Sequence, residues 1–286
     1  MMRSARTRTG ALCLLLIGAS AFSSGAGQER SPGSASAETV VRAEGPRELL
    51  PLASALRNAW REQSEDVEVS LGAGLSDRAR LDALANGAID VAFVGHGLDP
   101  LGAAARGMAA HKLGVTAVVF AVHADVTTRD LKPADLCDIY AGRVTTWDAY
   151  GGPSIPIQPL LRSESEPDAE VARAAIPCLQ NLTLGPAVVV ARTTSDMWVA
   201  LQSTSGAIGL TTSVAVRQSI VALRAVSIAS VPPTDLNVLS GRYPMVRPAW
   251  LVVPSSPSPP VLRFLAFTRS ERGAAAIAET GFLPVR

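Results

Sequence analysis

The sequence contains 286 residues, of which 48% are hydrophobic and 18% are charged, and its formal net charge is +1 at pH 7. Its arginines are scattered, so the composition argues against the basic surface of a nucleic-acid-binding protein. A chain of this length and hydrophobic content can bury one large core or two medium-sized cores.

The first residues have the pattern of a cleaved export signal. Three arginines precede an apolar run at residues 11–17, and small residues follow it. The run is far shorter than the roughly 20 residues that a membrane-spanning helix needs, so we expect no membrane insertion after cleavage. We predict a signal peptide at residues 1–21 and a flexible leader at residues 22–37, with Ser24-Gly25-Ala26 as the alternative cleavage site. Cleavage would change the net charge from +1 to −2 and leave a periplasmic protein.

Patterns typical of strands and helices alternate along the rest of the chain, which predicts an α/β fold. Strand patterns occur at the start of Thr39–Pro51 and at Val67–Leu71, Ile89–Val94 and Val115–Val122. Helix patterns begin near Leu49 and occur at Asp77–Ala85, Lys132–Tyr140, Ala169–Ala175 and Met197–Leu201. The β-branched run Val115–Val122 is too short for a membrane helix and is predicted to be a central strand.

Two cysteines, Cys137 and Cys178, remain after the predicted signal peptide is removed. Export favours a disulfide between them, while two buried free thiols are the alternative. The three histidines have no metal-binding spacing, and no nucleophile motif of a hydrolase is present. We therefore expect no enzyme, no metal and no cofactor.

The segment Leu131–Pro159 carries the most specific pattern in the chain. It resembles the Leu-Thr-x-x-x-Leu-x-x-Ile-Phe-x-Gly-Lys-Ile-Thr-x-Trp segment of the periplasmic phosphate-binding proteins of phosphate ABC transporters. The matching residues are Leu136, Ile139, Tyr140, Gly142, Arg143, Val144, Thr145 and Trp147. Segments at Ser205–Leu210, Gly241–Pro248 and Arg269–Pro284 resemble further family motifs in the same order. The helix is expected to end at Gly142, and Trp147 to fix the next turn to the core.

The resemblance implies a two-lobed type II periplasmic binding protein fold, each lobe a mixed sheet flanked by helices. Lobe one would comprise residues 38–120 and 225–286, and lobe two residues 121–224. A small oxyanion such as phosphate would bind between the lobes, at main-chain N–H groups near helix N-termini. The resemblance also implies an ABC permease as partner and a monomeric chain.

Four turns occupy the positions of the ligand loops of that family, and each departs from the family pattern. Their candidate ligand-binding residues are Gly45 and Arg47, Ala73 and Gly74, His96, and Arg162 with Ser163 and Ser165. The hydroxyl residues of the family pattern are replaced, and acidic residues stand at Glu166 and Asp168. A carboxylate a few ångströms from a bound anion repels it by roughly 1 to 4 kcal/mol.

Two interpretations of Glu166 and Asp168 remain open at this stage. They either oppose a bound anion or cap the helix predicted at Ala169–Ala175. The main hypothesis is an exported solute-binding protein that binds a small oxyanion, with phosphate bound weakly. The alternative is a repurposed scaffold that does not bind phosphate and acts as a partner or sensor protein, because function resides in the site and not in the fold.

Overall fold

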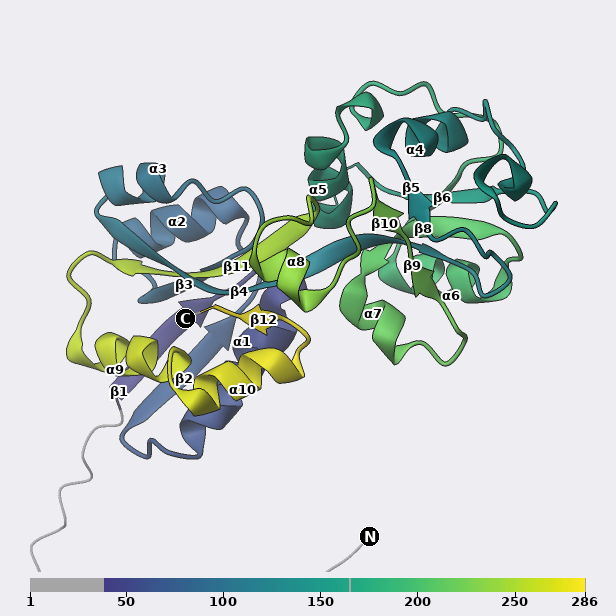
Figure 1. Cartoon of the computed structure of the whole chain (residues 1–286). Helices are drawn as coiled ribbons and strands as arrows, with labels where there is room; N and C mark the ends of the chain where they lie inside the picture. The colour runs from purple at the N-terminus through teal and green to yellow at the C-terminus, as the bar shows by residue number, and fades with distance from the viewer. Residues whose placement is uncertain (1–38, 165, 286) are drawn as a thin grey trace, which may run out of the picture. The chain divides into compact units, whose positions relative to one another are not determined.

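The computed structural model describes residues 39–164 and 166–285 (Figure 1). The predicted signal peptide and leader lie outside the described residues. No helix in the described ranges combines the length and the apolar composition needed to cross a membrane.

The strands are β1 (Thr39–Glu44), β2 (Val67–Gly72), β3 (Val91–Val94), β4 (Met108–Val122), β5 (Asp130–Leu131), β6 (Gln158–Arg162), β7 (Val189–Ala191), β8 (Ala207–Thr212), β9 (Arg224–Ala225), β10 (Ser227–Ile228), β11 (Val246–Pro254) and β12 (Leu283–Pro284). The α-helices are α1 (Leu50–Arg61), α2 (Asp77–Ala85), α3 (Pro100–Ala105), α4 (Pro133–Tyr140), α5 (Pro167–Ala175), α6 (Thr194–Ser203), α7 (Ser213–Gln218), α8 (Asp235–Leu239), α9 (Pro259–Thr268) and α10 (Glu271–Glu279). Short 3-10 helices are η1 (Arg47–Leu49), η2 (Trp147–Tyr150) and η3 (Pro177–Leu179).

The main sheet has the strand order β2-β1-β3-β11-β4-β8-β6-β7. β1 is parallel to β2 and β3, and β6 is parallel to β7 and β8, whereas β11 and β8 are antiparallel to β4. β4 pairs with β11 as far as Ala117 and with β8 from Val118 onward, so this one strand joins the two groups of parallel strands. The sequence had predicted only its second part, Val115–Val122, because the first part contains the polar residues His111 and Lys112.

One hydrophobic core lies between β1, β2, β3 and β11 and the helices α1, α9 and α10. Trp60 is its aromatic centre: its ring centroid lies 5.7 Å from that of Phe264 and 5.4 Å from that of Phe267. The indole Nε1 of Trp60 donates to the carbonyl oxygen of Val67 at 2.9 Å. The buried indole therefore also satisfies a main-chain acceptor of β2, as buried polar groups generally require.

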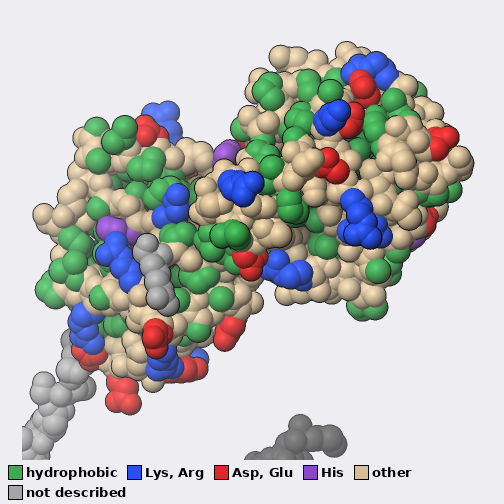
Figure 2. Space-filling model, viewed as in Figure 1, with side chains coloured by type: hydrophobic (Ala, Val, Ile, Leu, Met, Phe, Trp, Pro, Cys, Tyr) green, Lys and Arg blue, Asp and Glu red, His purple; other side chains and the backbone are tan. Residues whose placement is uncertain are grey.

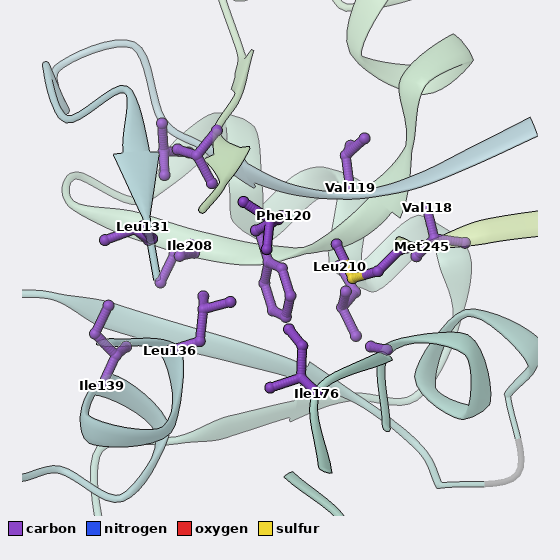
Figure 3. Close-up of a cluster of buried hydrophobic side chains, with 14 of the residues drawn as sticks. Val118, Val119, Phe120, Leu131, Leu136, Ile139, Ile176, Ile208, Leu210 and Met245 are labelled. Atoms are coloured by element: carbon purple, nitrogen blue, oxygen red, sulfur yellow. The ribbon is translucent and has the colours of Figure 1, made fainter. Parts of the chain in front are cut away.

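A second core surrounds Phe120 and packs Leu136, Ile139 and Ile176 against Ile208 (Figure 3). Trp147 is a fully buried member of this core, and its Nε1 donates to the carbonyl oxygen of Gly206 at 2.9 Å. This contact confirms that Trp147 fixes the turn after α4. The same core includes Val238 and Tyr243. The lobe boundaries inferred from the sequence stay a prediction.

Most predicted elements are present with shifted ends. α2 has the predicted bounds, and α4 ends before Gly142, which has φ = 70° as the residue after a helix C-cap. β3 begins two residues later than predicted, and the carboxylate of Asp90 just before it accepts hydrogen bonds from the main-chain N–H and the guanidinium of Arg42. α5 and α6 begin earlier than predicted, at Pro167 and Thr194.

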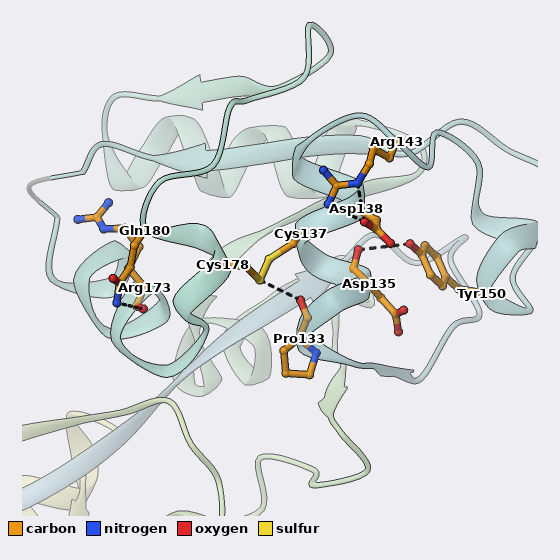
Figure 4. Close-up of a disulfide and its surroundings, with 9 residues drawn as sticks. All are labelled: Pro133, Asp135, Cys137, Asp138, Arg143, Tyr150, Arg173, Cys178 and Gln180. Atoms are coloured by element: carbon orange, nitrogen blue, oxygen red, sulfur yellow. Dashed lines mark hydrogen bonds and ion pairs between the residues drawn. A yellow bond between two sulfur atoms is a disulfide. The ribbon is translucent and has the colours of Figure 1, made fainter.

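Cys137 of α4 and Cys178 of η3 are joined in a disulfide, with their Cα atoms 6.2 Å apart (Figure 4). Cys137 is buried, and the Sγ atom of Cys178 lies 3.7 Å from the carbonyl oxygen of Pro133. The disulfide thus ties η3 to a helix that contributes to the second core.

Near the disulfide, the Tyr150 hydroxyl donates to the carbonyl oxygen of Asp135 at 3.3 Å. Burial, followed by the negative charges of Asp135 and Asp138, raises the pKa of Tyr150 to about 12.

Charged side chains of both signs are interspersed with neutral ones on the face shown in Figure 2. This distribution agrees with the scattered arginines of the sequence.

Candidate functional site

A polar cavity of about 400 Å³ lies beside the carboxyl ends of the parallel strands β1, β2 and β3. We call it the main cavity. Its lining residues are Gly45, Pro46, Arg47, Glu48, Gly74, Leu75, Ser76, Asp77, Arg80, His96, Pro167 and Glu170. The carboxyl edge of parallel strands is where α/β proteins commonly bind ligands, because turns and helix N-termini meet there.

The turn after β1 forms one wall of the main cavity. Gly45 donates its main-chain N–H to the carbonyl oxygen of Gly72 at 3.2 Å, and Pro46 then leads into η1. Arg47 and Glu48 are exposed side chains on this wall. Gly45 and Arg47, two of the predicted site residues, therefore line the same cavity.

The loop between β2 and α2 forms a second wall. Gly74 lines the cavity as predicted, whereas Ala73 does not. Ser76 is the N-cap of α2 and its hydroxyl accepts from the Ala79 amide at 3.4 Å, so it already serves the helix. Arg80 is buried and donates to the Asp77 carboxylate at 2.6 Å and to the Leu75 carbonyl at 2.7 Å. The charge of Arg80 is thus paired with Asp77 of the same helix, while its buried Nε has no acceptor among the described residues.

Glu44, which the sequence analysis did not select, lies directly beside this loop. Its side chain is almost fully buried at 8% exposure, and its Oε1 accepts the main-chain N–H of Leu75 at 3.1 Å. Ala43 and Glu44 are both buried, so β1 ends without the alternation that distinguishes inward from outward residues in a strand. In the sequence, only the position of Glu44 just before the turn residue Gly45 drew attention to it. That position does not show whether the side chain points into the protein or toward solvent.

His96 lines both the main cavity and an adjacent cavity of about 470 Å³. The adjacent cavity is partly apolar, with Leu81, Val94, Leu98 and Ala103 among its lining residues. Arg106 also lines it, and its guanidinium is paired with Asp82 at 2.5 Å. His96 therefore contributes to the site as predicted, at the place where the two cavities meet.

Arg162, at the end of β6, is buried at 4% exposure and does not line the main cavity. Its Nη2 donates to Oε2 of Glu166 at 2.7 Å and to the hydroxyl of Thr194 at 3.3 Å. Its Nε and Nη1 are buried and have no acceptor in residues 39–164 and 166–285. Ser163 follows Arg162 and does not line the cavity, and Ser165 lies outside the described residues.

Glu166 and Asp168 both point to arginines. Glu166 occupies the N-cap position of α5, but its side chain makes no cap hydrogen bond and pairs instead with Arg162. Asp168, in the first turn of α5, pairs with Arg247 of β11 at 2.9 Å. Of the two expected caps, Asp168 lies in the first turn of α5, whereas Glu166 forms no cap hydrogen bond, because the Arg162 guanidinium is a stronger partner than a main-chain N–H.

The charges that line the main cavity are mixed. Three carboxylates, those of Glu48, Asp77 and Glu170, accompany the guanidinium groups of Arg47 and Arg80 and the His96 ring. The described residues contain no group of three or more His, Cys, Asp or Glu side chains that could hold a metal ion. The site can therefore offer main-chain N–H groups and Arg47 to a solute, against a background of negative charge.

The strand order and the helices that flank the mixed sheet are those of the two-lobed α/β class. Residues 32–272 match the family model described as PBP superfamily domain, and the chain belongs to the PBP superfamily.

Relatives and solved structures agree with this assignment. The chain is 25% identical over 268 residues to the phosphate-binding protein PstS of Bacillus subtilis (strain 168). This match covers 91% of this chain and 83% of that protein. An ABC-type phosphate transport receptor from Vibrio cholerae is 20% identical with a TM-score of 0.69, covering 86% of this chain and 100% of its own. A putative phosphate ABC transporter substrate-binding protein from Clostridium perfringens, solved with bound phosphate, is 19% identical with a TM-score of 0.67, covering 87% of this chain and 100% of its own. These likenesses confirm the predicted type II periplasmic binding protein fold.

Proposed function

We propose that this protein is an exported solute-binding protein that binds a small oxyanion in the main cavity and delivers it to an ABC permease, without catalysing a reaction. Membership of the PBP superfamily and the resemblance to phosphate-binding proteins support the class of solute. The predicted export signal supports a periplasmic location.

The observation that carries the oxyanion proposal is the state of Arg162. Buried polar side-chain atoms are nearly always hydrogen-bonded in proteins, yet Nε and Nη1 of this guanidinium have no acceptor in the described part of the chain. Arg162 does not itself line the main cavity, but it lies at the end of the strand that leads into α5, and Pro167 and Glu170 of α5 line the cavity. An oxyanion that reaches this turn would satisfy donors that the described residues leave without an acceptor.

The carboxylates around the site argue for weak binding. Glu166 already accepts from Arg162, and Asp168 from Arg247. Each hydrogen bond to a charged group that a solute cannot form forfeits about 1.5 to 3 kcal/mol. Two or three such losses move an affinity from the micromolar to the millimolar range, since about 1.4 kcal/mol is a factor of ten.

The same internal pairs favour a second candidate function. A protein whose arginines are neutralised by its own carboxylates can be a repurposed scaffold that acts on a protein partner or as a sensor subunit. Under this alternative the cavity would hold no oxyanion.

Calorimetric titration separates the two functions. The chain from Phe22 onward would be titrated with phosphate, sulfate, arsenate and phosphonates at physiological salt. We expect saturable binding of phosphate in the millimolar range, lost in Arg162→Gln with the circular dichroism spectrum unchanged. A micromolar isotherm would contradict the argument from Glu166 and Asp168. Absence of heat with every oxyanion would favour the repurposed scaffold.

A further inference from the structure

We propose that Glu44 lowers the oxyanion affinity of the main cavity, because its carboxylate occupies, as an internal anion, a main-chain donor that a bound oxyanion would otherwise use. This inference rests on the proposed function and identifies the residue that keeps oxyanion affinity low.

The first support is the contact itself. Oε1 of Glu44 lies 3.1 Å from the main-chain nitrogen of Leu75, and Leu75 lines the main cavity. Leu75 immediately precedes Ser76, the N-cap of the nine-residue helix α2. The Leu75 amide thus lies just outside the helix, next to the N-terminal N–H groups that carry the positive end of the helix dipole and attract negative charge. The Glu44 carboxylate takes that place from within the protein.

The second support is the fit of Gly72 to this carboxylate. Glu44 and Gly72 are paired residues of the parallel strands β1 and β2. A Cβ atom on residue 72 would lie 2.1 Å from Oε2 of Glu44, which no real side chain could tolerate without displacing the carboxylate. The absence of a side chain at residue 72 thus provides the space in which the second carboxylate oxygen lies.

The third support is the isolation of this charge. Glu44 is 8% exposed and forms no ion pair with a lysine, arginine or histidine in the described ranges. A buried carboxylate without an ion-pair partner depends on hydrogen bonds from main-chain amides. Asp77, in the first turn of α2, is already paired with Arg80 at 2.6 Å and adds no uncompensated charge. An incoming oxyanion therefore meets the Glu44 carboxylate and one fewer available amide.

The test combines two variants with a matched control. Glu44→Ala frees the Leu75 amide and removes the charge, whereas Glu44→Gln removes the charge and retains an acceptor. Glu68→Gln makes the same charge change at an exposed residue of β2 outside the main cavity. We expect phosphate affinity, measured by calorimetry, to rise at least tenfold in Glu44→Ala and less in Glu44→Gln, and to stay unchanged in Glu68→Gln.

Amide hydrogen exchange of Leu75 provides a readout that needs no ligand. We expect the Leu75 amide to exchange at least tenfold faster in Glu44→Ala than in the parent protein, with Glu44→Gln intermediate. Unchanged exchange together with unchanged phosphate affinity in both variants would overturn the inference while leaving oxyanion binding by the parent protein intact. Faster exchange without phosphate binding by any variant would support the contact of Glu44 and overturn the proposed oxyanion function. If Glu44→Ala does not fold, Glu44→Gln decides by the same two measurements.

Discussion

Arg247 of β11 donates a hydrogen bond from Nη1 to Oδ1 of Asp168 in α5 at 2.9 Å, and the two side chains are only 11% and 17% exposed. The pair links β11 to α5. β11 lies between β3 and β4 in the sheet, and α5 contributes Pro167 and Glu170 to the main cavity. Partly buried pairs of this kind matter chiefly when one partner is lost, because the other charge remains without compensation.

We therefore expect Asp168→Asn to destabilise the protein by about 1 to 3 kcal/mol, since Arg247 would keep its charge without an ionised partner. Thermal unfolding followed by circular dichroism would show a lower Tm. The matched control is Glu62→Gln, which breaks the exposed pair of Glu62 with Arg272 and should leave Tm unchanged within error. An equal fall of Tm in the two variants would show that the partly buried pair of Asp168 and Arg247 contributes no more to stability than the exposed pair.

The charge of Glu166 is expected to weaken oxyanion binding. Glu166→Gln would remove a negative charge beside Arg162, and a repulsion of about 1 kcal/mol or more corresponds to at least a fivefold gain in phosphate affinity. Calorimetry would measure this gain. Glu164→Gln changes an exposed residue of the same turn and should have little effect. A gain of the same size in both variants would assign the effect to net charge alone.

Reduction of the disulfide is expected to destabilise the second core. Cys137 and Cys178 are 41 residues apart, and on the loop-entropy model such a cross-link contributes about 3 to 4 kcal/mol. Urea unfolding with and without a reducing agent would measure the loss. In the double variant Cys137→Ala/Cys178→Ala the reducing agent should have no further effect, and a residual effect there would contradict this assignment.

Gly206 and Gly151 offer a matched pair of glycine substitutions. Their φ angles are 69° and 70°, but an added Cβ would lie 2.0 Å from the Pro156 carbonyl oxygen at Gly206 and would meet nothing within 4 Å at Gly151. Gly151→Ala should cost only the conformational strain of about 1 to 2 kcal/mol. Gly206→Ala should cost clearly more, because the new methyl group would also clash with the Pro156 carbonyl oxygen and shift residue 206, whose own carbonyl oxygen accepts from Trp147. Similar free energies of unfolding would show that steric contact at Gly206 is relieved cheaply.

Acid pH is expected to weaken the contact between β1 and β3. The Arg42 guanidinium, which donates to Asp90, holds the pKa of that carboxyl below its usual range. Because the folded pKa lies below the unfolded value of about 3.9, this contribution is present above pH 4 and is lost as the pH falls through the folded pKa.

Asp90→Asn should therefore lower stability near neutral pH and make the fall of stability below pH 4 shallower than in the parent protein. Urea unfolding measured between about pH 2.5 and pH 7 would reveal the difference. Glu65→Gln, at an exposed residue, serves as the control. An unchanged profile in Asp90→Asn would contradict the proposed origin of the acid sensitivity.

Local patterns in the sequence predicted much of the fold. α2 has the predicted bounds, α4 lies within the predicted helix, and α6 contains the predicted segment Met197–Leu201. These features depend on neighbouring residues, such as a proline in the first turn or a hydroxyl three residues before an amide. The order of the motifs along the chain also predicted the superfamily, because several local patterns occur in the same order as in known members.

Only the tertiary structure decided the partners of the charged groups around the site. Arg162, Gly45 and His96 were visible as candidates, but the pairing of Arg162 with Glu166 and of Arg247 with Asp168 was not. Glu44 became important only when β1 and β2 came together and Gly72 left space beside it. Charge interactions act over distances in space, and the distances between these groups are set by strand register and helix packing that no short sequence pattern encodes.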